Sequence, residues 1–261
     1  MNKLLIATAA VAFATAGTAG AADLPTKAPP MVAAAPVASW TGCYVSGGVG
    51  YGMWNQDHFA ETTTTLTQLD PQTTTGGRGW LGRVGVGCDY QIAPQFLIGA
   101  FGDYDWMSLK GQWDDALAQG PAVVGTEKES ASWAAGVRVG YLPYPNLLTF
   151  ISGGWTQARF DQINFATATN PSIALTTGIP RQTYNGWFIG GGTEYRLPWW
   201  QNLTWKTEYR FSQFSSRDVA EVNLATGAAI GLSEHMEKFT QTVTTSLVWR
   251  FNFGGPVVAR Y

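Results

Sequence analysis

Charged side chains are scarce in this chain. Lysine, arginine, aspartate and glutamate make up 13% of the 261 residues, whereas a soluble domain usually contains about 25%. A soluble fold of this size would need more charge on its surface, so the composition favours a protein that exposes part of its surface to lipid. The balance of 16 basic and 18 acidic residues argues against nucleic acid as a partner, because phosphate binding needs a clustered excess of lysine and arginine.

Cysteine and histidine are also scarce, which limits metal and acid-base chemistry. The two cysteines, Cys43 and Cys88, match no metal-binding spacing. The two histidines, His58 and His235, are the only side chains of the sequence that ordinarily titrate near neutral pH. We therefore expect no metal and no other cofactor.

No apolar run reaches the ~20 residues that a membrane-spanning helix needs. The run from Leu4 to Ala16 follows Lys3 and precedes the small residues Ala19-Gly20-Ala21, which is the pattern of a secretory signal peptide. We predict a signal peptide over residues 1–21. Residues 22–39 are rich in alanine and proline and predict an extended periplasmic leader that cannot bury a core.

From Trp40 onward the chain alternates apolar and polar residues with a period of two, which indicates β-strands. The candidates are longer than the ~5 to 6 residues of soluble strands and suit tilted membrane strands of ~9 to 11 residues with extensions. We predict eight of them: Cys43–Trp54, Gly79–Ile92, Phe96–Met107, Ala131–Leu142, Leu147–Phe160, Thr183–Leu197, Leu203–Phe214 and Glu237–Phe253.

The connections between these segments alternate in length. Residues 93–95, 143–146 and 198–202 are tight turns with proline or asparagine, whereas the connections after Trp54, Met107, Phe160 and Phe214 are long and polar. Short turns at one end and long loops at the other are typical of outer-membrane barrels, with the short side in the periplasm. The predicted fold of residues 40–261 is therefore an all-β, eight-stranded antiparallel up-and-down transmembrane β-barrel in a Gram-negative cell outer membrane.

Most predicted strands separate apolar bulk from charge by parity, as lipid-facing and lumen-facing residues require. Aromatic residues near both ends of the outward face predict two girdles: Trp80, Tyr90, Phe96, Trp106, Trp133, Tyr141, Trp187 and Tyr195. Charges of both signs on the inward face predict a lumen network: Arg83, Asp89, Asp103, Asp105, Arg138, Glu194, Arg196, Lys206, Glu208, Arg210 and Arg250. An eight-stranded interior is just filled by side chains, so a plugged lumen is favoured over a selectivity filter.

Several segments resemble one protein family. These are Ala22-Asp23-Leu24-Pro25, Trp40-Thr41-Gly42-Cys43-Tyr44-Val45, Gly85-Val86-Gly87-Cys88-Asp89-Tyr90-Gln91 and the ending Arg250-Phe251-Asn252-Phe253-Gly254-Gly255-Pro256. Together they resemble the porin-like surface-antigen family of alphaproteobacterial outer membranes, which is related to opacity-type proteins. The resemblance implies an eight-stranded barrel with surface loops that contributes to envelope integrity and host contact; some members are described as porins or haem binders. Cys43 and Cys88 depart from the family, in which many members have an aromatic residue at these places.

Cys43 begins the first predicted strand and Cys88 ends the second, so an antiparallel hairpin brings both to the periplasmic edge. Cross-strand neighbours there lie close enough for a disulfide, which we predict, with free thiols as the alternative.

The sequence offers little chemistry for catalysis. Ser233, Glu234 and His235 are adjacent in a predicted loop, where three neighbours cannot all converge on one substrate. Gly190-Gly191-Gly192 lies within a strand rather than before a helix, so it is not a phosphate-binding loop. We expect no enzyme. Haem capture through His58, His235 and Trp113, which fall in predicted loops, remains an alternative.

The expected function is a structural, envelope-stabilising and surface-exposed outer-membrane barrel. The alternatives are a narrow porin for small solutes and a loop-borne binding site for haem or a host ligand. Expected partners are outer-membrane lipid, lipopolysaccharide and, during insertion, the barrel-assembly machinery, with Tyr261 or Phe253 as the terminal aromatic that the machinery recognises.

Overall fold

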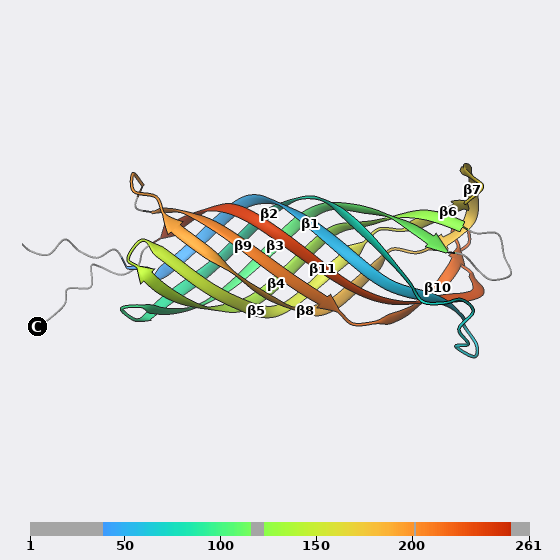
Figure 1. Cartoon of the computed structure of the whole chain (residues 1–261), viewed down its shortest axis with the longest axis horizontal. Coiled ribbons are helices and arrows are strands. Elements are labelled where there is room, and N and C mark those ends of the chain that lie inside the picture. The colour runs from blue at the N-terminus through green and yellow to red at the C-terminus, as the bar shows by residue number, and fades with distance from the viewer. Residues whose placement is uncertain (1–38, 116–122, 201, 252–261) are drawn as a thin grey trace, which may run out of the picture. The chain divides into compact units, whose positions relative to one another are not determined.

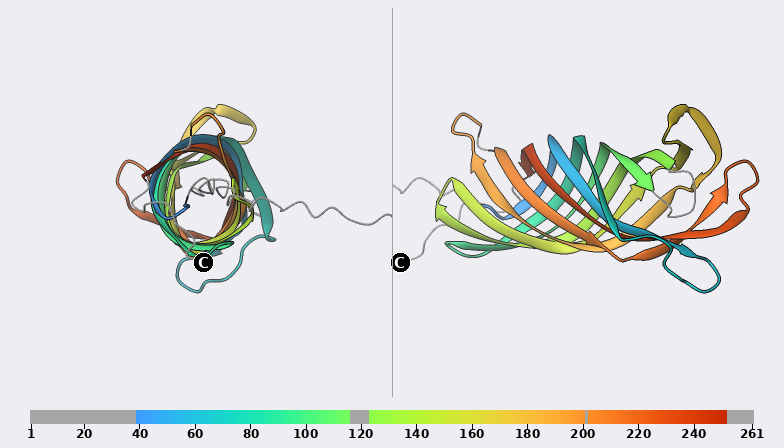
Figure 2. Two further views of the ribbon diagram at one scale, coloured as in Figure 1. Left: turned by 90° about the vertical axis from the view of Figure 1, so that its left-hand side faces the viewer. Right: turned by 45° about the vertical axis from the view of Figure 1, so that its right-hand side comes forward.

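Eight long antiparallel strands form a closed ring in the computed structural model, which describes residues 39–115, 123–200 and 202–251. Each strand pairs with the next, and the last strand pairs with the first from Cys43 opposite Phe251 to Thr62 opposite Leu232 (Figure 2). The ring strands are β1 (Gly42–Thr62), β2 (Thr73–Ala93), β3 (Phe96–Asp115), β4 (Val123–Tyr144), β5 (Leu147–Phe160), β8 (Gln182–Arg196), β9 (Leu203–Phe214) and β11 (Ala229–Phe251). The predicted all-β, eight-stranded antiparallel barrel is confirmed.

The predicted signal peptide, nearly all of the predicted leader and the terminal aromatics Phe253 and Tyr261 lie outside the described residues. Within the described ranges, no helix combines the length and the apolar character needed to cross a membrane.

The predicted long loops are wrong in large part, because much of their sequence forms strands. Beyond the predicted ends at Trp54 and Met107, β1 continues to Thr62 and β3 to Asp115. Three short strands, β6 (Ile163–Thr167), β7 (Asn170–Ile179) and β10 (Arg217–Asn223), extend the sheet at the same end of the barrel (Figure 1). His58 and Trp113 therefore lie in strands, and so does His235, which is in β11.

A reversal of polarity explains why this extension was hidden in the sequence. Between the two aromatic girdles the outward side chains are apolar and the inward ones charged. Beyond the outer girdle large apolar side chains also point inward, and Trp54, Leu109 and Trp113 are fully buried there beside polar groups such as Glu129 and Lys238. Polar headgroups and then water surround the wall beyond the girdle, so polar residues can turn outward and large apolar residues can fill much of the lumen.

The disulfide between Cys43 and Cys88 is present and joins β1 to β2. The two residues are directly opposite each other in the antiparallel register, which is the cross-strand position predicted from the hairpin. The bond fastens β1 beside the closing pair of the barrel, since Cys43 is also opposite Phe251 of β11.

The double variant Cys43→Ser, Cys88→Ser is expected to fold but to lose stability. Opening a loop with a sequence separation of 45 residues costs up to about 4 kcal/mol in the chain-entropy treatment. A folded barrel runs at a different place on a gel from the heated, unfolded chain. Following the folded band through a urea titration, with and without reductant, measures this loss. Wild-type protein that takes up alkylating agent at both cysteines without reduction would contradict the disulfide.

Candidate functional site in the barrel lumen

An apolar layer closes the lumen at the end with short turns, which is the periplasmic end in outer-membrane barrels. Its buried residues are Trp40, Leu97, Leu142, Leu148 and Phe150. The Trp40 indole Nε1 donates a hydrogen bond to the Pro145 carbonyl oxygen at 3.1 Å. The guanidinium groups of Arg196 and Arg250 lie 4.6 and 4.7 Å from the Trp40 ring centroid, so cation-π contacts hold this ring beneath the charged part of the lumen.

Above this layer lies the periplasmic cluster, which we define as Asp89, Arg138, Glu194 and Arg250. Arg138 contacts both carboxylates, with Nε 2.8 Å from Asp89 Oδ1 and Nη1 3.2 Å from Glu194 Oε2. Arg250 contacts the same two, with Nη1 2.8 Å from Asp89 Oδ2 and Nη2 2.7 Å from Glu194 Oε1. Two cations and two anions thus form a closed ring in which each charge touches two of opposite sign.

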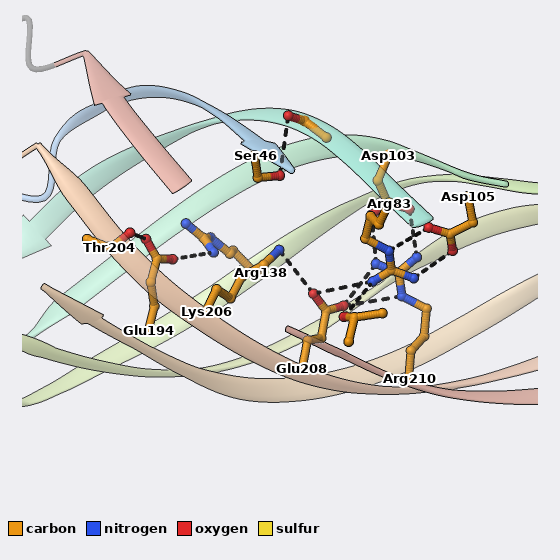
Figure 3. A network of polar contacts seen from close by, with 12 residues as sticks. Ser46, Arg83, Asp103, Asp105, Arg138, Glu194, Thr204, Lys206, Glu208 and Arg210 are labelled. Carbon is orange, nitrogen blue, oxygen red and sulfur yellow. Dashed lines mark hydrogen bonds and ion pairs between the residues drawn. The ribbon is translucent and has the colours of Figure 1, made fainter. Parts of the chain in front are cut away.

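The next layer is the central cluster, which comprises Arg83, Asp103, Asp105, Lys206, Glu208 and Arg210. Arg83 binds Asp105 through two hydrogen bonds of 2.7 Å, and Arg210 binds Asp103 through bonds of 2.8 and 2.7 Å. Glu208 lies between Arg210 at 2.9 Å and Lys206 at 3.2 Å. Figure 3 shows Arg83 and Arg210 side by side, with carboxylates around them. Each of these arginines forms a bidentate pair with its aspartate, in which both carboxylate oxygens accept a hydrogen bond.

A second apolar layer lies above the central cluster and includes Trp54, Leu109, Phe160, Tyr184 and Phe214. Trp54 fits against the β2 backbone because residue 77 is glycine: a Cβ there would be 2.5 Å from the indole. The Lys238 ammonium lies over the Phe160 ring, 4.3 Å from its centroid, and pairs with Glu127. At this height the lumen therefore holds the enclosed Lys238 ammonium rather than an open passage.

The extracellular end of the lumen is closed by a third apolar cluster. It consists of Trp113, Ile163, Phe165, Ile179, Val219 and Met236, contributed by β3, β6, β7, β10 and β11. The Trp113 ring stacks between Phe165 and His58, with centroid distances of 4.8 and 5.2 Å. Because His58 lies in this cap, burial lowers its pKa below the ordinary value.

All eleven residues of the predicted lumen network point inward, and the structure brings ten of them into the two clusters. Arg196 stands apart, against Trp40 and the Ser39 carbonyl oxygen. The eight predicted girdle aromatics are on the outer face and are between 38% and 70% exposed. The predicted lumen network did not include Lys238, Glu127 and Glu129, which are buried in the lumen. Lys238 has the same parity as Arg250 in the predicted strand Glu237–Phe253, so following that parity along the strand could have found it. Glu127 and Glu129 precede the predicted strand start at Ala131 and lie beyond the register irregularity between Glu129 and Ala131, which alternation within the predicted strand does not reveal.

The remaining candidates do not form one site. The Ser233 hydroxyl donates to Glu61 at 3.1 Å, and the His235 ring nitrogen Nδ1 is 2.5 Å from Asp218, so these two side chains have separate partners. Gly190, Gly191 and Gly192 lie within β8. Across the described ranges, no group of three or more histidine, cysteine, aspartate or glutamate side chains is arranged to hold a metal ion.

Removing Arg138 should destabilise the barrel far more than removing an exposed arginine. Arg138→Ala leaves Asp89 and Glu194 to share Arg250 in a buried setting, and breaking such a pair costs roughly 3 to 5 kcal/mol. Arg181→Ala, whose side chain is 65% exposed and 3.8 Å from Asp161, should cost at most about 1 kcal/mol. Urea titrations of both variants measure the difference. Equal losses would mean that the periplasmic cluster contributes no stability.

Acid should weaken the extracellular cap through His58. Since folding lowers the pKa of this histidine, its stabilising contribution is complete above the unfolded value and is lost as the pH falls through the folded one. His58→Gln cannot take up the proton, so the variant should lose less stability than wild type between neutral pH and about pH 4. Hydrogen exchange of the β1 and β3 extensions at both pH values measures this. Identical acid sensitivity in the two proteins would rule out the histidine as the cause.

Comparison with known proteins agrees with this architecture. No family model matches the sequence. The chain is 26% identical over 232 residues to the 31 kDa outer-membrane immunogenic protein of Brucella melitensis biotype 1, covering 85% of this chain and 91% of that protein. It is 26% identical over 221 residues to the 25 kDa outer-membrane immunogenic protein of Brucella canis, covering 83% and 86%.

A solved structure with the same fold is the outer membrane protein OprG from Pseudomonas aeruginosa. The TM-score is 0.51 at 9% identity, and the match covers 83% of this chain and 100% of the other. The strands, the girdles and the relatives agree on where the protein resides. This chain is an outer-membrane β-barrel protein and a homologue of the Brucella outer-membrane immunogenic proteins, the kind of surface antigen that its sequence resembles.

Proposed function

We propose that this protein is a structural barrel of the outer membrane, with a lumen that neither conducts nor catalyses. The observation that carries the proposal is the filling of the lumen by alternating layers: apolar at the periplasmic end, ionic in two clusters, then apolar again and capped. Each layer joins strands that are distant in the ring, so the interior braces the wall. A braced barrel with an exposed outer end suits envelope stabilisation and surface display.

A narrow porin is the second candidate, and the packing of the lumen argues against it. The space between Arg83, Glu129 and Phe214 amounts to about 10 Å³, which holds at most a single water molecule. Paired arginines and carboxylates also offer a passing ion no free charge to exchange with. Conduction would require the clusters and at least one apolar layer to rearrange together.

Haem binding through the histidines is less well supported. His58 is 1% exposed and is stacked on Trp113, which is fully buried. These two side chains cannot reach a large planar ligand at the surface without opening the cap. His235 contacts Asp218 on the exposed edge, and one histidine with a carboxylate partner is a weak basis for haem capture. Catalysis lacks support for a similar reason, since Ser233 is bound to Glu61 rather than to a histidine.

Folded protein in a planar bilayer is expected to give no stepwise conductance. The filled lumen leaves no continuous water path, so current should stay at the level of the bare bilayer under both polarities. The preparation should first be shown to be folded by the shift of its gel band on heating, which reports a closed barrel. Reproducible unitary steps from heat-modifiable protein would overturn the proposal in favour of the porin.

A further inference from the structure

Three basic residues stand in one line across the outer face of the barrel. The register places Arg78 of β2 opposite Lys110 of β3, and Lys110 opposite Lys128 of β4. Their neighbours in sequence, such as Gly77, Leu109, Glu127 and Glu129, are buried, so the three cations point outward. Like charges directly opposite each other in a sheet destabilise it. We call this line the basic row.

The protein supplies little negative charge to offset the basic row. Lys128 is 3.9 Å from Asp161, which is also 3.8 Å from Arg181. In the part of the chain that the structure describes, neither Arg78 nor Lys110 has a carboxylate within ion-pair distance. Inside the same wall every arginine of the two clusters is paired. The unpaired charge outside therefore points to an anion from the surroundings.

The height of the basic row indicates which anion is available. Arg78 lies two residues beyond the girdle residue Trp80, and Lys110 lies four residues beyond Trp106. With a rise of ~3.3 Å per residue and a ~40° tilt, the row is roughly 5 to 10 Å above the outer girdle. This is where the headgroups of the outer leaflet begin. Side chains that point outward at this height meet headgroups rather than bulk solvent.

A surface pocket adjoins the row on its extracellular side. It has a volume of about 500 Å³, and its lining includes Lys110, Gln112, Thr126, Asn164 and Pro171. Strands β3 and β4 form its floor, and the hairpin of β6 and β7 forms a wall. The volume is within the range of small-ligand sites, and amide and hydroxyl groups next to a cation are suited to a sugar that carries a phosphate.

We propose that the basic row and this pocket bind the phosphorylated sugar headgroup of an outer-leaflet glycolipid, with lipopolysaccharide as the natural source. The phosphate lies on Arg78, Lys110 and Lys128, and the adjoining sugar occupies the pocket. The proposal rests on the proposed function in one respect only, since it needs the barrel to sit in the outer membrane with this end outward. It explains why a like-charged row is tolerated, because the lipid completes the charge balance.

The test compares lipid retention by folded barrels in nanodiscs that contain bisphosphorylated lipid A. Native mass spectrometry counts the lipid A molecules that remain on each barrel. The triple variant Arg78→Gln, Lys110→Gln, Lys128→Gln should retain at least about tenfold less lipid A than wild type, since charge-assisted hydrogen bonds to phosphate are among the stronger polar contacts. The matched control Arg159→Gln, Arg181→Gln, Arg217→Gln removes three cations from the same end but outside the row, and should bind as wild type does.

Further experiments test whether the site recognises the phosphorylated sugar headgroup or any simple anion. Asn164→Trp fills the pocket and should weaken retention of lipid A while leaving that of phosphatidic acid unchanged, because only lipid A carries a sugar. Dephosphorylated lipid A should be retained by none of the proteins. Equal retention by the triple variant and the control would overturn the basic row, and full displacement of lipid A by inorganic pyrophosphate would show that a soluble anion is the ligand.

The outcome is independent of conduction. A barrel that retains lipid A through the row yet conducts ions would contradict only the proposed function. A barrel that gives no conductance, but whose triple variant still binds lipid A, would contradict only the glycolipid site.

Discussion

The hydrocarbon around the barrel is the constraint on which the rest of the structure depends. Lipid offers no hydrogen bonds, so every backbone donor and acceptor at that depth must be paired inside the protein, and a sheet can do this only by closing. The pairing of β1 with β11 supplies the closure. Once the sheet is closed, parity sends apolar side chains to lipid and leaves the charged ones facing one another across a narrow interior.

The narrow interior then decides how the charges are arranged. Arg138 and Arg250 both bind Asp89 and Glu194. Arg83 and Arg210 each donate two hydrogen bonds to one aspartate. A buried charge without a partner would cost several kcal/mol, so the clusters are filled in both signs. Their contacts run between strands far apart in the ring, and the same contacts that balance charge also block the lumen. Bracing and sealing are therefore two results of one arrangement.

The wall continues past the membrane, and its polarity changes where the solvent changes. At the outer girdle Trp80 faces lipid, and below it Arg83 faces inward; beyond the girdle Trp54 and Trp113 face inward and Lys110 faces outward. The lumen above the membrane behaves like the core of a soluble protein and forms a cap. The outer surface at the same height carries the basic row beside the pocket, just where lipid headgroups replace hydrocarbon. A single barrel thus meets three surroundings, and its outer chemistry follows each of them.

The sequence by itself determined the features that depend on local alternation and turn chemistry. These are the eight ring strands within the membrane, the short turns at one end, the outward aromatics and the hairpin that places Cys43 beside Cys88. Only the tertiary structure decided that the polar segments after Trp54 and Met107 continue as strands, because their stability comes from inward contacts among β1, β3 and the short strands. It also decided the register, shifted by irregularities such as the one between Glu129 and Ala131. Register places Lys110 between Arg78 and Lys128, and no periodicity within one strand can reveal which residues of another lie opposite.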